Sequence, residues 1–507
     1  MIKKGLSVLT RVKEETGATR FESKNPAILS DVLGVFGCAS KKQIESVCLA
    51  AKKAFLTWKK VPPPVRAGII HNFGVLLGRN KEALSRLITR EMGKPIKEAR
   101  GDVQEAIDTC QFFAGEGRRL YGMTTPSELP FKELYTYRRP VGVFACITAG
   151  NFPVAVPSWY FVPALLCGNV CVWKPSEDTP LTSYYFAQLL YKSGLPKNVF
   201  NVLFGKGAGS TGEWLIQGVE KELIDKFGFT GSTAVGVRIG EVCGRNLQQP
   251  CLELGGKNPM VVMEDADLEL ASTSALWAGF GTAGQRCTSL GNLILHGAIR
   301  DKFLKLLLAK VAKMKIGDPM REDIVYGPMI SEKFMSNFLG FLDTLIKPHH
   351  KILTKPNGRM KNLKDGLYVY PTIVDNVKPK DEIYFTETFG PIFNVMTCKN
   401  LGEAIRLANG TGYGLASAIY TQNPNYIYQW KEEISSGMTS INNSPSGAEV
   451  HLPFGGNGKS GNGSRLSGIW VLDQFTRWQA VNWDLSGKLQ LAQIETTYIE
   501  PDLDYKI

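Results

Sequence analysis

Residues 141–173 contain no charged side chain, and this run limits the possible folds more than any other part of the chain. A hydropathy scan would treat such a run as a candidate membrane helix. Three prolines, three glycines and two asparagines interrupt it, however, and divide it into a strand over 141–148, a helix over 158–166 and a strand over 169–173. Short apolar strands around a helix are typical of a buried parallel sheet, so we predict a βαβ unit and no membrane span.

The length and composition indicate a folded protein of more than one domain. A chain of 507 residues is too long for one compact core. Its 44% hydrophobic and 21% charged residues are ordinary for a globular protein. The net charge of +12 comes from Lys and Arg that are interleaved with Asp and Glu, which predicts a basic, solvated surface. We find no basic stripe typical of nucleic-acid binding, although an anionic substrate or cofactor would fit the excess charge.

The cysteines and histidines limit the chemistry. The ten cysteines form no Cys-x-x-Cys pair and no Cys/His spacing typical of a metal site, so we predict no metal. Several of them lie in apolar runs, which favours a reducing cytoplasmic location. Residues 1–16 are charged and lack the apolar core of a secretory signal. The five histidines do not favour a His-dependent triad.

Hydrophobic spacing predicts the remaining elements. Helices are expected over 41–60, 64–89 and 99–120, and the stretch 102–118 has the pattern of a surface-facing helix. Strands are expected over 131–137, 199–204, 223–229 and 475–483, the first as an edge or arm strand.

Two glycine-containing turns are candidates for binding phosphate. The strand over 223–229 leads into Thr230-Gly-Ser-Thr233 and a helix over 234–243, so N–H groups near Gly231 and Ser232 would face an anion. Ser232 as an ordinary N-cap is compatible with this site. Gly207-Ala-Gly-Ser-Thr-Gly212 matches the dinucleotide pattern, but no acidic partner follows the next strand, so this match is a weak signal.

Lys174 and Glu177 lie just beyond a predicted buried strand, where doubly wound sheets bind ligands. A carboxylate there can accept hydrogen bonds from both hydroxyls of a ribose and would disfavour a 2′-phosphate, which favours NAD over NADP. The plainer alternative is a solvated surface ion pair.

Three residues are candidates for catalysis on a carbonyl group. Cys287 would be the nucleophile, since a thiolate can attack the carbonyl carbon. Asn151 would donate a hydrogen bond to the resulting oxyanion, and Glu253 would activate water. A buried, inert thiol is the alternative for Cys287, and a turn residue before Pro153 is the alternative for Asn151.

The motifs Phe229-Thr-Gly-Ser-Thr233, Glu253-Leu-Gly-Gly256 and Gly284-Gln-Arg-Cys-Thr288, in this order, closely resemble the aldehyde dehydrogenase superfamily. The resemblance covers residues 23–487. It implies a nucleophilic Cys287 that forms a thiohemiacetal and then a thioester, and a pyrophosphate on the helix after Phe229. It also places Lys174 and Glu177 on the adenosine ribose. In Glu387-Thr-Phe-Gly-Pro391 it places Glu387 on the nicotinamide ribose and Phe389 beside the ring. The other cofactor contacts that it implies are Ile147, Gly207, Gly231, Ser232 and Leu254.

The resemblance also implies the architecture. We expect an α/β fold with a Rossmann-like NAD-binding domain (1–121 and 142–252), a second α/β catalytic domain (253–455) and a small β oligomerisation arm (122–141 and 469–490). The strand-like run 475–483 is expected to pair with the arm strand of a neighbouring subunit in a homodimer or homotetramer. Residues 491–507 form a tail with acidic residues that we expect to contact a neighbour.

The substrate is left open by the sequence. Ser444-Pro-Ser-Gly-Ala-Glu449 resembles the entrance loop of the aminoadipate-semialdehyde branch. That branch has arginines shortly after its cysteine, whereas Gly291 and Asn292 stand here, so its carboxylate anchor is not evident. We expect oxidation of an aldehyde or ω-semialdehyde. Glutamate or ketoglutarate semialdehyde is the alternative within the class, and a thiol hydrolase or a catalytically silent relative is the alternative outside it.

Overall fold

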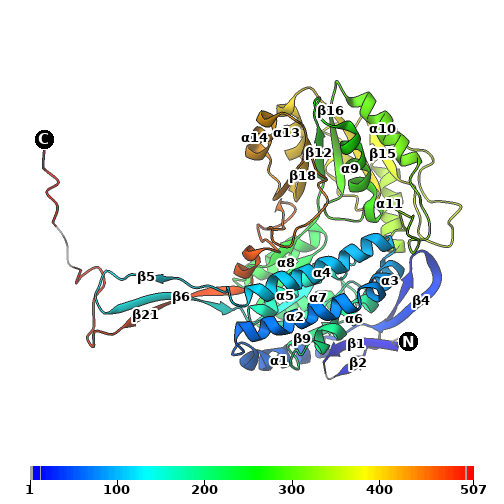
Figure 1. Ribbon diagram of the computed structural model, residues 1–507. Coiled ribbons are helices and arrows are strands. Elements are labelled where there is room, and N and C mark those ends of the chain that lie inside the picture. Colours follow the sequence, from blue (N-terminus) through cyan, green and yellow to red (C-terminus); the bar gives the residue numbers. More distant parts are fainter. Residues whose placement is uncertain (1–3, 12, 497–499) are drawn as a thin grey trace.

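The computed structural model describes residues 4–11, 13–496 and 500–507, which form two α/β units and a protruding β arm (Figure 1). Each unit is built on its own sheet and has its own hydrophobic core. The predicted fold class is therefore confirmed.

The first unit contains a nine-stranded sheet in the order β11-β10-β7-β8-β9-β1-β4-β3, with β2 paired to β1. Its central strands β7 and β8 are entirely buried and run parallel, as the uncharged run of sequence predicts. The strands are β1 (Lys4–Thr10), β2 (Glu14–Thr16), β3 (Arg20–Asn25), β4 (Ile28–Gly37), β7 (Val143–Ile147), β8 (Val170–Lys174), β9 (Phe200–Leu203), β10 (Lys226–Thr230) and β11 (Cys251–Glu253).

Helices pack around this sheet, and two of them differ from prediction. The single helix expected over 64–89 is two helices, because the chain leaves helical geometry at Asn80. The helix expected to face the surface is instead packed against three other helices, and its Asp102, Val103 and Ala106 are buried. The helices are α1 (Lys41–Trp58), α2 (Pro63–Arg79), α3 (Lys81–Met92), α4 (Ile96–Glu116), α5 (Ala155–Leu166), α6 (Pro180–Lys192), α7 (Thr211–Glu220) and α8 (Thr233–Arg245).

The second unit contains a seven-stranded sheet in the order β14-β15-β16-β13-β12-β18-β19, parallel except for β14. Its strands are β12 (Asn258–Val262), β13 (Leu290–His296), β14 (Lys351–Ile352), β15 (Thr372–Asp375), β16 (Ile392–Cys398), β18 (Ala416–Tyr420) and β19 (Met438–Ile441). Its helical segments are α9 (Leu268–Phe280), η1 (Gly281–Gly284), α10 (Arg300–Ala312), α11 (Glu332–Thr344), α12 (Glu382–Phe385), α13 (Leu401–Asn409) and α14 (Pro424–Glu433). Beside this sheet, β17 (Tyr413–Gly414) pairs with β20 (Asn457–Gly458).

The chain passes from one sheet to the other within four residues. Strand β11 ends at Glu253 on the edge of the first sheet, and β12 begins at Asn258 in the second. The Glu-Leu-Gly-Gly motif is therefore the connection between the two units, and its residues lie where the units face each other.

The arm is a three-stranded sheet of β5 (Thr124–Thr125), β6 (Lys132–Pro140) and β21 (Thr476–Asp484), and it extends away from the body of the molecule (Figure 1). The expected strand over 475–483 exists as β21, which lies at the edge of the arm sheet, and its pairing with a neighbouring subunit stays a prediction. One edge of β21 pairs with β6 of the same chain, antiparallel over nine residue pairs. The segment η2 (Ile469–Asp473) leads into it.

No helix in the described ranges is long and apolar enough to cross a membrane. All ten cysteines are free thiols, and all except Cys287 are buried.

Candidate active site

A cavity of about 790 Å³ lies between the two units. It is bordered by these predicted residues: Asn151, Gly231, Ser232, Leu254, Cys287, Glu387 and Phe389. The structure thus brings the candidate nucleophile, the candidate oxyanion donor and part of the predicted cofactor set to one cavity. The other predicted residues, Ile147, Lys174, Glu177, Gly207, Phe229 and Glu253, lie outside its lining.

Cys287 follows η1 and precedes β13, and its side chain is the one partly exposed thiol among the ten. Burial, followed by the nearby carboxyl groups of Glu253 and Glu387, raises the pKa of this thiol to about 12. Without bound ligands the sulfur is therefore protonated. It is also close enough to both carboxylates for their charges to act on it, so the three groups form one electrostatic unit.

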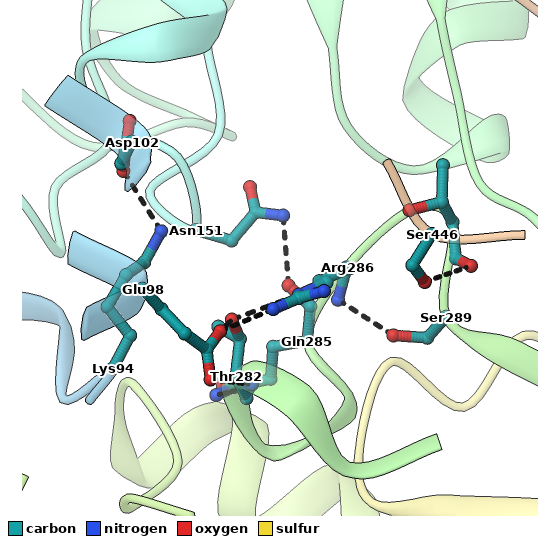
Figure 2. Close-up of polar contacts among 10 residues, drawn as sticks. Lys94, Glu98, Asp102, Asn151, Thr282, Gln285, Arg286, Ser289 and Ser446 are labelled. Carbon is teal, nitrogen blue, oxygen red and sulfur yellow. Dashed lines mark hydrogen bonds and ion pairs between the residues drawn. The ribbon is translucent and has the colours of Figure 1, made fainter. Parts of the chain in front are cut away.

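Asn151 follows β7 in a buried loop that points toward the nucleophile segment. Its side-chain amide donates a 2.9 Å hydrogen bond to the main-chain carbonyl of Gln285, two residues before Cys287 (Figure 2). The Gln285 side chain is fixed in turn, because its amide donates to the Thr282 carbonyl and its oxygen accepts from the Ile330 N–H. Asn151 is thus more than a turn residue, since it links the first unit to the peptide before the thiol.

Glu253 ends β11 with a carboxyl group that is buried and has no hydrogen-bond partner on either oxygen among the described residues. Burial raises its pKa well above the usual range, and the positive charge of Arg465 only partly opposes this. Burial therefore favours the protonated form of this carboxyl group. An unsatisfied buried acid is costly, and it is expected where a water molecule or a ligand completes the site.

Glu387 lies against the connection between the sheets. Its Oε1 accepts a 3.2 Å hydrogen bond from the Gly256 N–H, and a Cβ on Gly255 would stand 1.8 Å from its Oε2. Gly255 must therefore be glycine for this carboxyl to fit. Burial raises the pKa of Glu387 to about 7, and burial lowers the pKa of the neighbouring Lys257 to about 7. Phe389 packs its ring on Phe334.

The start of α8 fits a dinucleotide diphosphate. Ser232 has the backbone geometry of an N-cap, yet its hydroxyl accepts no hydrogen bond from the first turn. Ser232 therefore does not cap the helix through its side chain, and Gly231 and Ser232, which come just before the first turn of α8, border the cavity. Unpaired N–H groups and the helix dipole at such a position favour a bound anion.

The residues predicted for the rest of the cofactor lie beside this helix start. Phe229 precedes it on β10 and pairs in register with Ile147 on β7, and its carbonyl accepts a hydrogen bond from Tyr160. Gly207 has open space where a side chain would be, and its carbonyl accepts from the Glu213 N–H at the start of α7.

Lys174 and Glu177 form an ion pair at 2.9 Å at the carboxyl end of β8. The Lys174 side chain is only 2% exposed, so the alternative of a solvated surface pair does not fit. Burial favours a higher pKa for Glu177, but Lys174 outweighs it and holds the pKa below its ordinary value. Glu177 is therefore ionised at neutral pH and would repel a 2′-phosphate.

The sequence interpretation missed Glu105. It lies on α4 and borders the cavity, and its Oε1 is buried without a partner in the described structure. Burial, together with the charges of Asp102, Asp108 and Glu449, raises the pKa of Glu105 to about 8. A signal was present in the sequence, since Glu98, Asp102 and Glu105 have the spacing of one helix face and all three border the cavity.

The loop that carries Glu449 also borders the cavity. Ser446 donates to the carbonyl of Thr288, which ties the loop to the residue after the nucleophile. The following Gly447 and Ala448 line the cavity, and neither N–H has a hydrogen-bond partner within the described residues. This edge of the cavity therefore offers donors and a carboxyl group close together.

Gly291 and Asn292, where a substrate anchor was sought, lie elsewhere. Both are buried in β13, and the Asn292 side chain donates to the Tyr384 carbonyl. Both residues pack between strands, and neither supplies a charged group for a substrate carboxylate.

One group of possible metal ligands occurs in the described chain, formed by His349, His350 and Asp381. Both imidazole Nε2 atoms bond to the same carboxylate oxygen of Asp381. The Nδ1 of His350 accepts from the Lys347 N–H, which puts the ring proton on Nε2, between imidazole and carboxylate. The three side chains thus form a hydrogen-bonded cluster that joins two loops.

Comparisons with known proteins agree with this geometry. A profile of the aldehyde dehydrogenase family matches residues 12–481. The chain is 32% identical to an alpha-ketoglutaric semialdehyde dehydrogenase of Bacillus subtilis, over 93% of this chain and 96% of that protein. It is 35% identical to an alpha-aminoadipic semialdehyde dehydrogenase of Bos taurus, over 90% and 84%. The crystal structure of a betaine aldehyde dehydrogenase from Staphylococcus aureus, with NAD+ and a modified cysteine, superposes with a TM-score of 0.91 at 29% identity, covering 96% and 99% of the two chains.

Proposed function

The chain belongs to the aldehyde dehydrogenase family, and from this membership we propose that it oxidises the ω-semialdehyde of an α-amino acid to the dicarboxylic amino acid. The enzyme class is NAD-dependent aldehyde dehydrogenase. The observation that carries the finer proposal is the unpaired oxygen of Glu105 in the wall of the cavity that contains Cys287.

Oxidation begins at Cys287. The sulfur, once it has lost its proton, bonds to the aldehyde carbon, and the carbonyl oxygen becomes an oxyanion. Asn151 can turn its amide from the Gln285 carbonyl toward this oxygen, and the N–H of Cys287 is the second donor that we assign. NAD held by the residues assigned below would supply hydride acceptance, and loss of the hydride from the thiohemiacetal carbon leaves a thioester on Cys287.

Hydrolysis of the thioester needs a base, because neutral water is a poor nucleophile. We assign this role to Glu253, whose oxygens have no competing protein partner. Its raised pKa makes it a strong base once it is ionised, and the proton that it takes from water accompanies the attack on the thioester carbon. The carbon–sulfur bond then breaks, which releases the acid and restores the thiolate.

We assign substrate recognition to Glu105, Gly447 and Ala448 in the wall of the cavity. An ammonium group would satisfy the unpaired oxygen of Glu105, and would ionise this acid by lowering its raised pKa. A carboxylate would accept hydrogen bonds from the unpaired N–H groups of Gly447 and Ala448. Glu449 acts electrostatically on Glu105, so the two binding groups are close enough for one amino-acid head group.

The remaining residues are assigned to NAD. The uncapped start of α8 at Gly231 and Ser232 would hold the diphosphate, and Glu177 would hold the adenosine ribose. We assign the nicotinamide half to Glu387 and Phe389. Ile147, Lys174, Gly207, Phe229 and Leu254 complete the proposed contact set.

We also propose a function for each segment of the chain. Residues 1–121 and 142–252 would bind NAD, and residues 253–455 would bind and convert the aldehyde. The arm, 122–141 and 469–490, would join subunits, since Tyr137, Trp478 and Trp483 are exposed on it. The tail, 491–507, would contact a neighbour in the same homodimer or homotetramer. Ten free cysteines support a cytoplasmic location.

The test compares aldehydes that differ in the groups at the end of the molecule opposite the aldehyde. Aminoadipate semialdehyde, adipate semialdehyde without the amino group, and hexanal would be assayed for NADH formation with the wild type and Glu105→Gln. We expect the wild type to prefer the amino compound in kcat/KM, and Glu105→Gln to lose about tenfold or more on this substrate alone, the usual cost of a lost charged hydrogen bond.

Gln111→Ala is the control, because Gln111 is exposed on the same helix outside the cavity lining. It should leave all three values nearly unchanged. Equal loss on adipate semialdehyde and hexanal would contradict the role of Glu105, and a wild-type preference for the compound without the amino group would contradict the substrate class.

A further inference from the structure

We propose that Glu98 is a positioning residue that holds the nucleophile segment in its reactive conformation. It rests on the assignment of Cys287 as the nucleophile. Glu98 does not touch the thiol and acts through the turn 281–286 that precedes it. Figure 2 shows its carboxylate directed at Thr282 and Arg286.

The turn before Cys287 has an unfavourable backbone. Thr282 has a φ of 52° and Ala283 a φ of 53°, and Gly284 follows with a φ of 69°. This left-handed region suits glycine but disfavours residues with a Cβ, and two such residues in succession require external support. Such strain persists where surrounding groups fix the conformation, and here it lies directly beside the proposed nucleophile.

Glu98 supplies that support from the other unit. It lies in the first turn of α4, and its side chain is 5% exposed. Its Oε1 accepts a 3.1 Å hydrogen bond from the Thr282 N–H, and its Oε2 accepts from the Thr282 hydroxyl. One carboxylate thus fixes both the main chain and the side chain of a left-handed residue.

The same carboxylate fixes Arg286, the residue before the nucleophile. The guanidinium forms an ion pair at 2.5 Å with Glu98 and donates from Nε to the Thr282 hydroxyl. It also lies over the Trp277 ring at 4.3 Å. A Cβ on Gly281 would come within 2.9 Å of this guanidinium, so the turn is shaped around it.

Asn151 bonds to the carbonyl of Gln285, which lies between these two anchors. Because Glu98 holds Thr282 and Arg286 on either side, it sets the position of the thiol relative to the oxyanion donor. A buried ion pair with only a stabilising role would account for the Arg286 contact, but not for the bond to the strained Thr282 N–H. We therefore expect an effect on the chemistry of Cys287 beyond any effect on stability.

The experiment measures the thiol directly. Wild-type enzyme and Glu98→Gln would be alkylated with iodoacetamide at one pH, with the rate at Cys287 followed by peptide mass spectrometry. The rate of the first NADH burst with saturating NAD and aldehyde would be measured in parallel. Glu98→Gln keeps the size of the side chain but not its charge, and we expect both rates to fall about tenfold, the scale of small displacements of a reacting group.

Two further variants test whether strain in the turn before Cys287 causes the loss of rate. Ala283→Gly removes the Cβ from the left-handed turn without removing a hydrogen bond, so in the Glu98→Gln background it should restore about threefold of the lost rate. Arg100→Gln is the control, because Arg100 lies on the same helix in an exposed ion pair with Glu82, and it should leave both rates unchanged.

Unchanged rates in Glu98→Gln, with only a lower melting temperature, would overturn the proposal. The absence of any rescue by Ala283→Gly would overturn its strain mechanism. The alkylation rate does not depend on the role of Cys287 in turnover. That role is tested separately by the activity of Cys287→Ala.

Discussion

Glu253 Oε1 lies so close to Gly455 that a Cβ on this glycine would stand 2.9 Å from it. Gly455 also has a φ of 157°, where residues with side chains are strained, and its Cβ would approach the Ser464 carbonyl within 2.5 Å. Gly455 belongs to the turn Pro453-Phe-Gly-Gly456. The lack of a side chain at Gly455 leaves room for the buried carboxyl group of Glu253, which we assign as the base.

Gly455→Ala should consequently slow turnover by about tenfold or more, since the added methyl group displaces Glu253 from the thioester. The NADH burst should remain, because its chemistry does not require water. Stopped-flow absorbance with a melting curve measures both effects. Gly244→Ala, which meets no atom within 4 Å, is the control and should turn over normally. Loss of the burst in Gly455→Ala would place the defect before hydrolysis.

The reactivity of Cys287 should increase with pH. Burial and the two nearby carboxylates raise the pKa of the thiol to about 12, so the thiolate fraction grows about tenfold per pH unit throughout the neutral range. The alkylation rate of the NAD-free enzyme, measured between about pH 6 and pH 9, should therefore rise with a slope near one. A plateau below pH 8 would show a thiol that ionises much more easily than its surroundings imply.

A second pH effect concerns the substrate. Below its raised pKa of about 8, Glu105 is mostly neutral and attracts an ammonium group weakly. The KM for aminoadipate semialdehyde should thus fall as the pH rises toward 8 and then level off. The KM for hexanal provides the comparison and should lack this change, as should the KM for the amino compound in Glu105→Gln. The same pH dependence for both aldehydes would assign the effect to another group.

Glu177 should determine the choice of cofactor. It is ionised beside Lys174 and would repel the 2′-phosphate of NADP. The wild type should prefer NAD, and Glu177→Gln should narrow the NAD/NADP ratio of kcat/KM by about tenfold, the effect of removing one close like charge. Calorimetry with each cofactor measures the same preference without turnover. A wild type that already prefers NADP contradicts this role.

Much of the fold could be predicted because its signals are local. The uncharged run predicted β7, α5 and β8 because a buried parallel sheet requires apolar strands on both faces. The break between α2 and α3 was missed, because Asn80 is the only residue in the sequence that marks it. The pairing of β21 with β6 of the same chain was not predicted, because it joins segments more than 300 residues apart along the chain.

The site was predictable where chemistry is concentrated in a motif. Cys287 and Asn151 belong to such motifs and border one cavity. Glu98 and Glu105 do not, because their roles depend on α4 packing against the other unit, and their helix-face spacing alone resembles that of any solvated helix. The left-handed turn at Thr282 gave no signal at all, since Thr and Ala are not the residues that such a backbone favours.

The central claim, a covalent thioester on Cys287 that Glu253 hydrolyses, is tested most directly by stopped-flow absorbance of NADH with Glu253→Gln, together with intact-mass analysis. We predict a burst near one NADH per active site, an acyl adduct on Cys287, and turnover slower by about 10²–10⁴-fold, the usual contribution of a general base. Cys287→Ala, as the control, should show neither burst nor adduct while still binding NAD. Normal steady-state turnover in Glu253→Gln, or a burst without an adduct on Cys287, would contradict the account.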